Sequence, residues 1–189
     1  FLPFISALLL AVIGRRLPRP AVETIACLAV LGSLGMAIIA FVSAGQKSQI
    51  LTLLPWFAVG DCSAAMSVYY DPLAAVMALM VTFVSSLIHL YSVSFMREDE
   101  DYVRFFCYMN LFVFAMLVVS LSDNLLFLYL GWEGVGFCSY ALIGFWYSDE
   151  VKATAGRKAF VLTRIGDVAF GIAIAFFFLL YNTLSLSSI

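Results

Sequence analysis

Long apolar segments dominate this sequence and restrict what it can fold into. All but the first have the roughly 20 residues that a helix needs to cross a hydrocarbon layer about 30 Å thick. Because a helix satisfies its own backbone polar groups inside a bilayer, the pattern predicts an all-α polytopic membrane protein with about six transmembrane helices. The segments lie at about residues 1–14, 22–44, 72–96, 104–121, 124–146 and 157–181.

The composition agrees with a membrane location and argues against a nucleic-acid partner. The chain is 64% hydrophobic and 12% charged, whereas globular proteins average roughly 45 to 50% apolar and about 25% charged residues. Its 10 basic and 12 acidic side chains are nearly balanced, and no basic cluster is interleaved with aromatic residues. Most of the surface must therefore face lipid or other helices, and the charge pattern that nucleic acid requires is missing.

The two ends of the sequence predict a piece of a larger protein. The chain opens on Phe1, and Arg15 and Arg16 follow the short first segment instead of preceding it as they would in a signal peptide. The chain stops at Ile189, shortly after the sixth segment. We therefore expect an amino-terminal fragment whose first helix lacks its start.

Basic residues in the connections indicate how the helices cross the membrane. The connections after the first, third and fifth segments are rich in arginine and lysine, whereas the opposite connections hold only Lys47. Because basic residues favour the cytoplasmic or matrix side, this bias places the amino terminus on the outer, periplasmic side. The basic residues on the inner side are Arg15, Arg16, Arg19, Arg97, Arg104, Lys152, Arg157 and Lys158.

The one long connection, residues 45–70, is external in this orientation. Its apolar stretches Leu51–Val59 and Met66–Tyr70 flank a turn-like pair, Gly60-Asp61. This pattern predicts a short β-hairpin that lies on the outer surface.

A carboxylate lies deep inside the fifth segment. Glu133 is about nine residues into the apolar run that starts at Leu125, which is roughly 14 Å along a helix and hence near the bilayer midplane. An ionisable group at that depth costs about 2.5 to 3.5 kcal/mol on insertion scales, so it usually marks the path of an ion or proton. We therefore interpret Glu133 as a candidate proton site.

Two further charges occupy the sixth segment at a similar depth. If that helix begins near Arg157 and runs outward, Asp167 lies about ten residues, roughly 15 Å, from its inner end and level with Glu133. Arg164 precedes Asp167 by three residues and shares its helix face. Helices joined by a short loop are usually neighbours, which predicts that Glu133, Arg164 and Asp167 meet in the bundle interior.

A fixed cation beside a buried carboxyl group provides a means of loading and releasing a proton. Desolvation favours the protonated form of a carboxyl group, whereas a nearby cation favours the ionised form. Arg164 keeps its charge, so we assign it as the fixed cation and Glu133 as the titrating group. Asp167 either holds Arg164 in place or competes with Glu133 for it. The structural alternative is an Arg164–Asp167 ion pair that only locks its own helix.

Lys158 and His89 are secondary candidates for points at which protons enter from the inner surface. Lys158 begins the predicted sixth helix, where it can equally extend its ammonium group to the interface. His89 lies two turns from the inner end of the third helix, and a histidine satisfied by hydrogen bonds is the simpler interpretation there.

No residues point to a redox centre, a metal site or a nucleotide site. Four dispersed cysteines lack CxxC spacing, and the sequence holds neither a P-loop nor GxGxxG after a strand. We therefore assign no catalytic, cofactor-binding or metal-binding residue. Moving a proton outward requires about 2.3 kcal/mol per 100 mV, which must come from partner subunits or from a counter-ion gradient.

Two stretches resemble one protein family. LGWEGVGFCSYALIGFWY at 130–147, preceded by SDNL at 122–125, and KAFVLTRIGD at 158–167 resemble the largest antiporter-like membrane subunit of respiratory complex I, which is subunit L in bacteria and subunit 5 in mitochondria. The resemblance covers nearly all of the chain and is most specific from Asp71 to about Phe170. It implies that Glu133 is the proton-site carboxylate of helix five, and that Arg164 and Asp167 are the arginine-x-x-aspartate pair of helix six.

The resemblance also implies an architecture and a role. It implies part of an antiporter-like inverted-repeat fold, with helices one to three and the hairpin in 1–103 and the first helices of the first repeat in 104–189. The role is that of a proton-translocating, non-redox subunit of NADH:quinone oxidoreductase that is not catalytic alone. The family's later helices, with a partner lysine and histidine, are expected beyond this chain.

The same resemblance implies the surroundings of the chain. NADH, FMN, iron-sulfur clusters and quinone are expected in partner subunits. The expected partners are other complex I membrane subunits, especially the neighbouring antiporter-like one, and lipid. The expected location is an energy-coupling membrane, with the bacterial inner membrane favoured over the mitochondrial one.

Other assignments share this architecture. The large subunit of multisubunit sodium/proton antiporters is one alternative, and membrane subunits of bicarbonate-uptake or hydrogenase complexes are another. A third is a purely structural docking module whose charges lock its helices. The details at 131–136 and 163–167 favour complex I.

Overall fold

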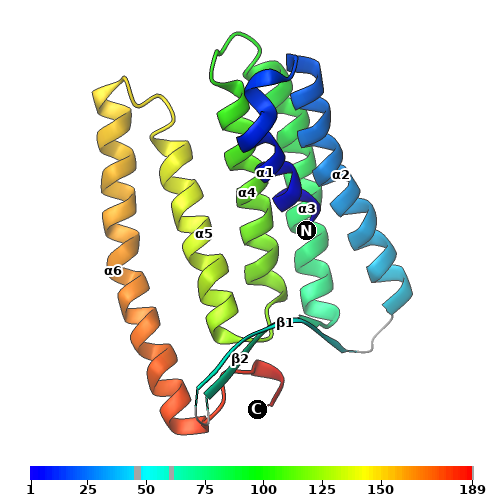
Figure 1. Ribbon diagram of the computed structural model, residues 1–189, viewed down its shortest axis with the longest axis vertical. Helices are drawn as coiled ribbons and strands as arrows, with labels where there is room; N and C mark the ends of the chain where they lie inside the picture. Colours follow the sequence, from blue (N-terminus) through cyan, green and yellow to red (C-terminus); the bar gives the residue numbers. More distant parts are fainter. Residues whose placement is uncertain (45–47, 60–61, 189) are drawn as a thin grey trace. The chain divides into compact units, whose positions relative to one another are not determined.

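The computed structural model describes residues 1–44, 48–59 and 62–188, and it is mainly helical (Figure 1). A helix is present at each of the six predicted segments. The elements in chain order are α1 (Leu2–Ile13), the 3-10 turn η1 (Gly14–Arg16), α2 (Arg19–Ala44), β1 (Gln49–Val59), β2 (Cys62–Tyr70), α3 (Pro72–Phe95), α4 (Tyr102–Leu121), α5 (Leu125–Ile143), α6 (Glu150–Tyr181) and η2 (Leu186–Ser188).

The helix lengths confirm the membrane prediction for five of the six segments. Among the described residues, α2 to α6 are long and apolar enough to cross a membrane. The first helix, α1, has 12 residues and is the short one, as the sequence predicted. The chain is therefore a multi-pass membrane protein with a small hairpin.

The start of α6 differs from the prediction. The helix begins at Glu150 and not near Arg157, because Asp149 caps it by accepting a hydrogen bond from the Val151 amide at 3.0 Å. Its first two turns are polar, so they left no apolar signal in the sequence. Lys158 consequently lies in the third turn of α6 and does not begin the helix.

The predicted hairpin in 45–70 is confirmed. β1 and β2 pair antiparallel from Gln49 opposite Tyr70 to Val59 opposite Cys62, and the register shifts on both sides of Pro55. Proline has no amide hydrogen for the ladder, which fits its place at an irregularity. The second strand starts at Cys62, earlier than the predicted Met66, and the predicted Gly60-Asp61 turn lies outside the described residues.

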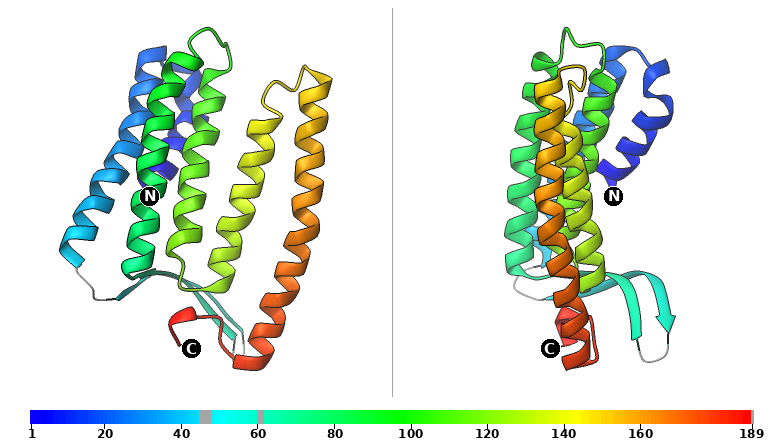
Figure 2. Two further views of the ribbon diagram at one scale, coloured as in Figure 1. Left: turned by 180° about the vertical axis from the view of Figure 1, so that it is seen from behind. Right: turned by 90° about the vertical axis from the view of Figure 1, so that its left-hand side faces the viewer.

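The chain forms two compact units. Unit 1 comprises residues 1–45 and 75–114, and unit 2 comprises residues 46–74 and 115–189. Unit 1 therefore holds α1, α2, most of α3 and the first part of α4, while unit 2 holds the hairpin, the end of α4, α5 and α6 (Figure 2). The division into 1–103 and 104–189 was drawn from the family's repeat and stays a prediction.

Unit 1 is organised around the ring of Phe106. The fully buried Phe106 belongs to a core cluster with Leu10 of α1 and Val22 of α2. At one end of the unit, the Arg19 guanidinium donates to the Asp99 carbonyl at 2.5 Å. This bond joins the start of α2 to the α3–α4 connection, so two of the three basic connections share one end of the unit.

In unit 2, α5 and α6 run antiparallel (Figure 1), and their backbones come close where the end of α5 meets the start of α6. A Cβ atom on Gly156 would lie only 3.0 Å from the Gly144 nitrogen and 3.3 Å from the Tyr140 carbonyl oxygen. Because these atoms belong to the backbone of the α5 end, they cannot move aside as a flexible side chain would. Glycine at 156 therefore allows the close contact.

The opposite ends of α5 and α6 are joined through the Asp123 cluster, which consists of Asp123, Ser67, Ser185 and Ser187. The buried Asp123 carboxylate accepts hydrogen bonds from the Ser185 hydroxyl at 2.8 Å, the Ser67 hydroxyl at 3.3 Å and the Ser187 amide at 3.0 Å. The Leu125 amide also donates to the Leu184 carbonyl at 2.9 Å. The start of α5 is thus tied to the segment that follows α6 and to β2.

Candidate charge site between α5 and α6

The three predicted charges meet at the α5–α6 interface. The Arg164 guanidinium of α6 forms an ion pair with the Glu133 carboxylate of α5. The same Nη1 atom lies 3.4 Å from Oδ2 of Asp167, three residues further along α6. Sequence depth and helical spacing therefore predicted this juxtaposition correctly.

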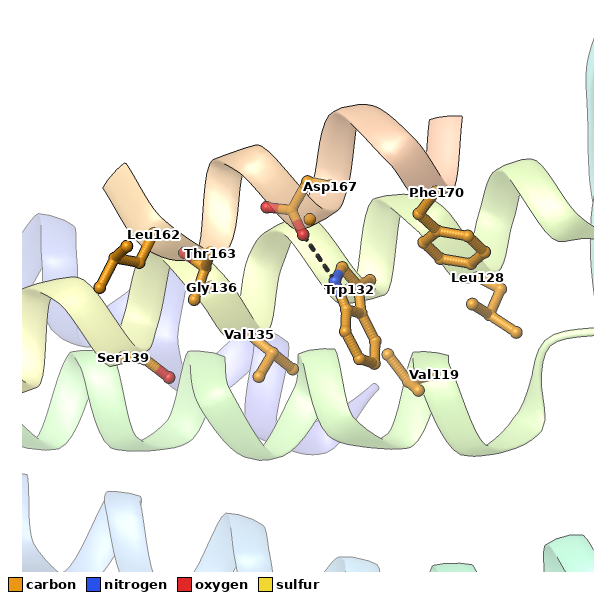
Figure 3. A pocket seen from close by; sticks show the side chains of 11 residues that line it. Val119, Leu128, Trp132, Val135, Gly136, Ser139, Leu162, Thr163, Asp167 and Phe170 are labelled. Atoms are coloured by element: carbon orange, nitrogen blue, oxygen red, sulfur yellow. Dashed lines mark hydrogen bonds between the residues drawn. The ribbon is translucent and has the colours of Figure 1, made fainter. Parts of the chain in front are cut away.

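Asp167 is held from α5 by groups that the sequence analysis did not assign. The Trp132 indole N–H donates to Oδ1 of Asp167 at 2.8 Å, as the dashed line in Figure 3 marks. The Tyr129 hydroxyl donates to the Asp167 carbonyl at 3.3 Å. Trp132 directly precedes Glu133 in the sequence. This position on α5 was the one feature from which a contact between Trp132 and the charge site could have been predicted. Asp167 itself is only 5% exposed.

The charges of the site do not cancel. Two carboxylates share one guanidinium, so the three groups carry a formal net charge of −1 when both acids are ionised. The Arg164 guanidinium also lies 4.4 Å from the centre of the Phe160 ring, which adds a cation–π contact. The site therefore places one permanent cation between carboxyl groups of α5 and α6.

A cavity of about 690 Å³ lies beside this site in unit 2. Its lining is mainly apolar, and Asp167, Thr163 and Ser139 contribute polar groups (Figure 3). Water can occupy a cavity only where polar groups bind it. Asp167 is therefore the charged side chain of the cavity lining that can bind water or another polar molecule there.

Close packing against α4 positions α5 within the same unit. A Cβ atom on Gly131 would lie 2.8 Å from Cγ1 of Val118 and 3.0 Å from the Val119 nitrogen. Only a glycine fits at this distance, and it stands two residues before Glu133. The backbone that carries the carboxylate is therefore fixed by α4 on one face and by α6 on another.

The two secondary candidates, Lys158 and His89, lie in different units. Lys158 is exposed and precedes Arg164 by six residues on α6. His89 is buried in unit 1, where Nδ1 lies 2.8 Å from the Ser85 carbonyl oxygen and Nε2 has no hydrogen-bond partner among the described residues. The interpretation of His89 as a fully satisfied histidine is therefore correct for only one of its nitrogens. The assignment of Lys158 and His89 as points of proton entrance stays a prediction.

Two family models match the chain. The model described as "NADH-Ubiquinone oxidoreductase (complex I), chain 5 N-terminus" matches residues 56–106, and the model described as "NADH:quinone oxidoreductase/Mrp antiporter, TM" matches residues 122–189. Together they cover both the hairpin region and the charge site.

Curated relatives agree with these models. NADH-quinone oxidoreductase subunit L of Escherichia coli K12 is 43% identical over 169 residues, which is 86% of this chain and 27% of the relative. The subunit L of Pseudomonas aeruginosa PAO1 is 46% identical over 165 residues, 82% of this chain and 27% of the relative. NADH-ubiquinone oxidoreductase chain 5 of Triticum aestivum is 38% identical over 193 residues, 100% of this chain and 28% of the relative. The chain thus spans about a quarter of the length of these relatives.

Solved structures show the same fold at low sequence identity. A chain of the archaeal membrane-bound sulfane sulfur reductase superposes with a TM-score of 0.83 at 22% identity, covering 97% of this chain and 37% of that one. A chain of the Mrp complex from Dietzia sp. DQ12-45-1b gives a TM-score of 0.80 at 22% identity, covering 98% and 20%. Both place the chain in the antiporter-like fold.

Proposed function

Because this chain belongs to the complex I family of subunit L in bacteria and chain 5 in mitochondria, we propose that it takes part in proton translocation across an energy-coupling membrane. The relatives are membrane subunits of an oxidoreductase complex. In this proposal the chain contributes part of a proton path and no redox centre, and it acts as a translocase only within the assembled complex.

The proposed roles follow from the contacts of the site. Glu133 is the titrating group, because its carboxylate faces Arg164 from the opposite helix. Arg164 is the fixed cation. Asp167 is the positioning residue, since Trp132 holds its carboxylate at 2.8 Å while its other oxygen faces Arg164. The observation that carries the proposal is the single guanidinium shared by two carboxylates in helices that cross a membrane.

The surroundings of the chain are part of the proposal. NADH, FMN, iron-sulfur clusters and quinone would be bound by partner subunits, and the contacts of this chain would be with other complex I membrane subunits, the neighbouring antiporter-like one above all, and with lipid. We place the amino terminus on the outer side of a bacterial inner membrane, in preference to the mitochondrial one. The positive-inside bias of the connections supports this orientation. The sequence KAFV at 158–161 favours the bacterial membrane.

The test is proton pumping by the complete complex that contains this chain, reconstituted in proteoliposomes. Glu133→Gln keeps the size of the side chain and removes its ability to ionise, so the protons moved per NADH oxidised should fall by more than half. Glu150→Gln, an exposed glutamate at the start of α6, is the matched control and should pump normally. Undiminished pumping in Glu133→Gln, with the complex intact, would reject the proposal.

Sodium/proton antiport is the second candidate, because one matching family model and one solved structure with the same fold include Mrp antiporters. It predicts cation exchange in vesicles that lack NADH oxidation, driven by an imposed sodium gradient. Exchange that depends on sodium and survives without flavin or iron-sulfur subunits would favour this function. Proton movement that depends on NADH and ignores sodium would favour the first.

A further inference from the structure

Unit 1 contains buried polar atoms that the proposed function does not use. Nε2 of His89, Oδ1 of Asn110 and Oγ of Ser6 have no hydrogen-bond partner among the described residues. These side chains are 1%, 0% and 4% exposed. Inside a membrane an unsatisfied polar group costs several kcal/mol, so three of them in one compact unit require a physical account.

Phe106 of α4 is a neighbour of both His89 and Asn110. The His89 imidazole of α3 lies 6.3 Å from the Phe106 ring, measured between ring centroids. Asn110 is one helical turn after Phe106 and donates from Nδ2 to the Phe106 backbone carbonyl at 3.0 Å. His89 is thus next to the ring of Phe106, and Asn110 is bonded to its backbone.

Ser6 of α1 lies at the level of Asn110. The Phe4 ring packs 4.6 Å from the Phe114 ring, and the Cys107 thiol donates to the Ala7 carbonyl at 3.3 Å. These two contacts fix α1 antiparallel to α4. Ser6 lies between the α1 contact residues, and Asn110 lies between the α4 contact residues.

The chemistry of the three atoms specifies what is missing. A carbonyl oxygen only accepts, so the 2.8 Å contact with the Ser85 carbonyl assigns the hydrogen of a neutral His89 ring to Nδ1 and leaves Nε2 as an acceptor. Asn110 already donates from its Nδ2, so its free Oδ1 atom is a second acceptor. Among the described residues, no donor reaches either acceptor. The site therefore lacks a donor for each of them.

We infer that unit 1 holds a buried water site between α1, α3 and α4, in which a water molecule donates to His89 Nε2 and Asn110 Oδ1 and accepts from the Ser6 hydroxyl. Water has the two O–H donors that the two acceptors need, and buried waters typically make about three hydrogen bonds. Hard cations prefer oxygen ligands alone, so an imidazole nitrogen favours water over such an ion. This inference goes beyond the proposed function and does not rest on it.

The direct test is a cryo-microscopy map of the complete complex at a resolution that shows ordered water. We expect a water peak within about 2.7 to 3.2 Å of both His89 Nε2 and Asn110 Oδ1. An empty space between them, or a protein donor that meets each acceptor directly, overturns the inference. The wild-type map is independent of any variant's ability to fold.

A double-mutant cycle provides the second test, with the melting temperature of the purified complex as its readout. Asn110→Leu and His89→Leu should each lower that temperature, because each leaves the water and the other acceptor with fewer partners. The double variant should melt no lower than the worse single variant, since no unpaired acceptor remains. Fully additive losses overturn the shared water.

Thr82→Val combined with Asn110→Leu is the matched control. Thr82 is a buried α3 residue whose hydroxyl donates to the Ala78 carbonyl of its own helix at 2.7 Å. Its loss should therefore add to that of Asn110→Leu. If the losses in melting temperature add for Thr82 and Asn110 but not for His89 and Asn110, the coupling is specific to the pair that shares the water.

Discussion

The buried hydroxyls of α3 in unit 1 and the charge site of unit 2 are bonded in different ways. In unit 1, the hydroxyls of Thr82, Ser86 and Ser92 donate to carbonyls one turn earlier on α3 itself. In unit 2, the charge site is held by contacts between helices, from Arg164 to Glu133 and from Trp132 to Asp167. Bonds within one helix survive a change in helix spacing, whereas bonds across an interface do not. The polar site of unit 2 therefore depends on how closely α5 and α6 pack.

The largest expected effect comes from removing the cation that joins the two helices. Arg164→Leu leaves two carboxylates in the membrane without their shared cation, so we expect it to destabilise the assembled protein by about 3 kcal/mol and to abolish pumping. Arg164→Lys keeps the charge and should retain more of both. The checks are the melting temperature of the complex and protons moved per NADH oxidised. Equal stability of the Leu variant and the wild type would remove the contrast between the units.

A Cβ atom at Gly131 tests whether close packing is needed on the α4 side of α5. Gly131→Ala places a methyl group 2.8 Å from Cγ1 of Val118, so we expect a loss of about 1 to 3 kcal/mol through overpacking. Gly166→Ala is the matched control, because nothing lies within 4 Å of its Cβ position and alanine favours a helix. Thermal unfolding should therefore distinguish the two variants. A control variant that melts as early as Gly131→Ala would point to glycine content and not to packing.

Removing a hydroxyl that bonds to its own helix should have a much smaller effect. Ser86→Ala removes the 2.7 Å bond to the Thr82 carbonyl. Hydrogen bonds between helices of membrane proteins average about 0.6 kcal/mol, and we expect a bond within one helix to contribute no more. We expect a melting temperature within a few degrees of the wild type and unchanged pumping. A loss as large as that of Arg164→Leu would show that unit 1 also depends on contacts across helices.

The smallest expected effect comes from an exposed ion pair at the start of α6. The Lys152 ammonium, 3.3 Å from the Asp149 carboxylate, donates a hydrogen bond that holds the pKa of Asp149 below its ordinary value. A lowered pKa in the folded state stabilises the α6 start above the unfolded value of about 3.9, and this contribution disappears as the pH falls through the folded value. The protection factor of the Val151 amide, which is its intrinsic exchange rate at each pH divided by the observed rate, should therefore fall in acid.

Asp149→Asn is the control for this pH dependence. Asparagine still caps a helix but does not titrate in this range. The protection factor of the Val151 amide in the variant should depend little on acid. A wild-type profile that matches the variant would show that the Lys152 pair contributes nothing measurable.

Hydropathy and helical spacing were enough to predict the helices and the core of the charge site. Glu133, Arg164 and Asp167 stand at depths set by counting residues along apolar runs, and the structure brings them together. Counting apolar residues did not predict the correct start of α6, because its first turns are polar. The first turns of α6 carry Lys152 and Arg157, so their start is set by the Asp149 cap and not by apolar residues.

Contacts made by single atoms were beyond the reach of sequence reasoning. An indole N–H can serve packing, an interface or a bond, and only coordinates show that Trp132 donates to Asp167. The Asp123 cluster is similar, because Ser67, Ser185 and Ser187 are far from Asp123 along the chain. No spacing rule brings residues so far apart in sequence to one carboxylate.

The fastening of α5 and α6 at both ends has a kinetic consequence. The Asp123 cluster holds one end of the pair, and the backbone contact of Gly156 with Gly144 holds the other. Sliding of one helix along the other would break these contacts. Rotation about side-chain bonds is therefore the motion that separates Arg164 from Glu133 at the lowest free-energy cost. Under the proposed function, a separation of this kind would be faster than the microsecond to millisecond motions of whole domains.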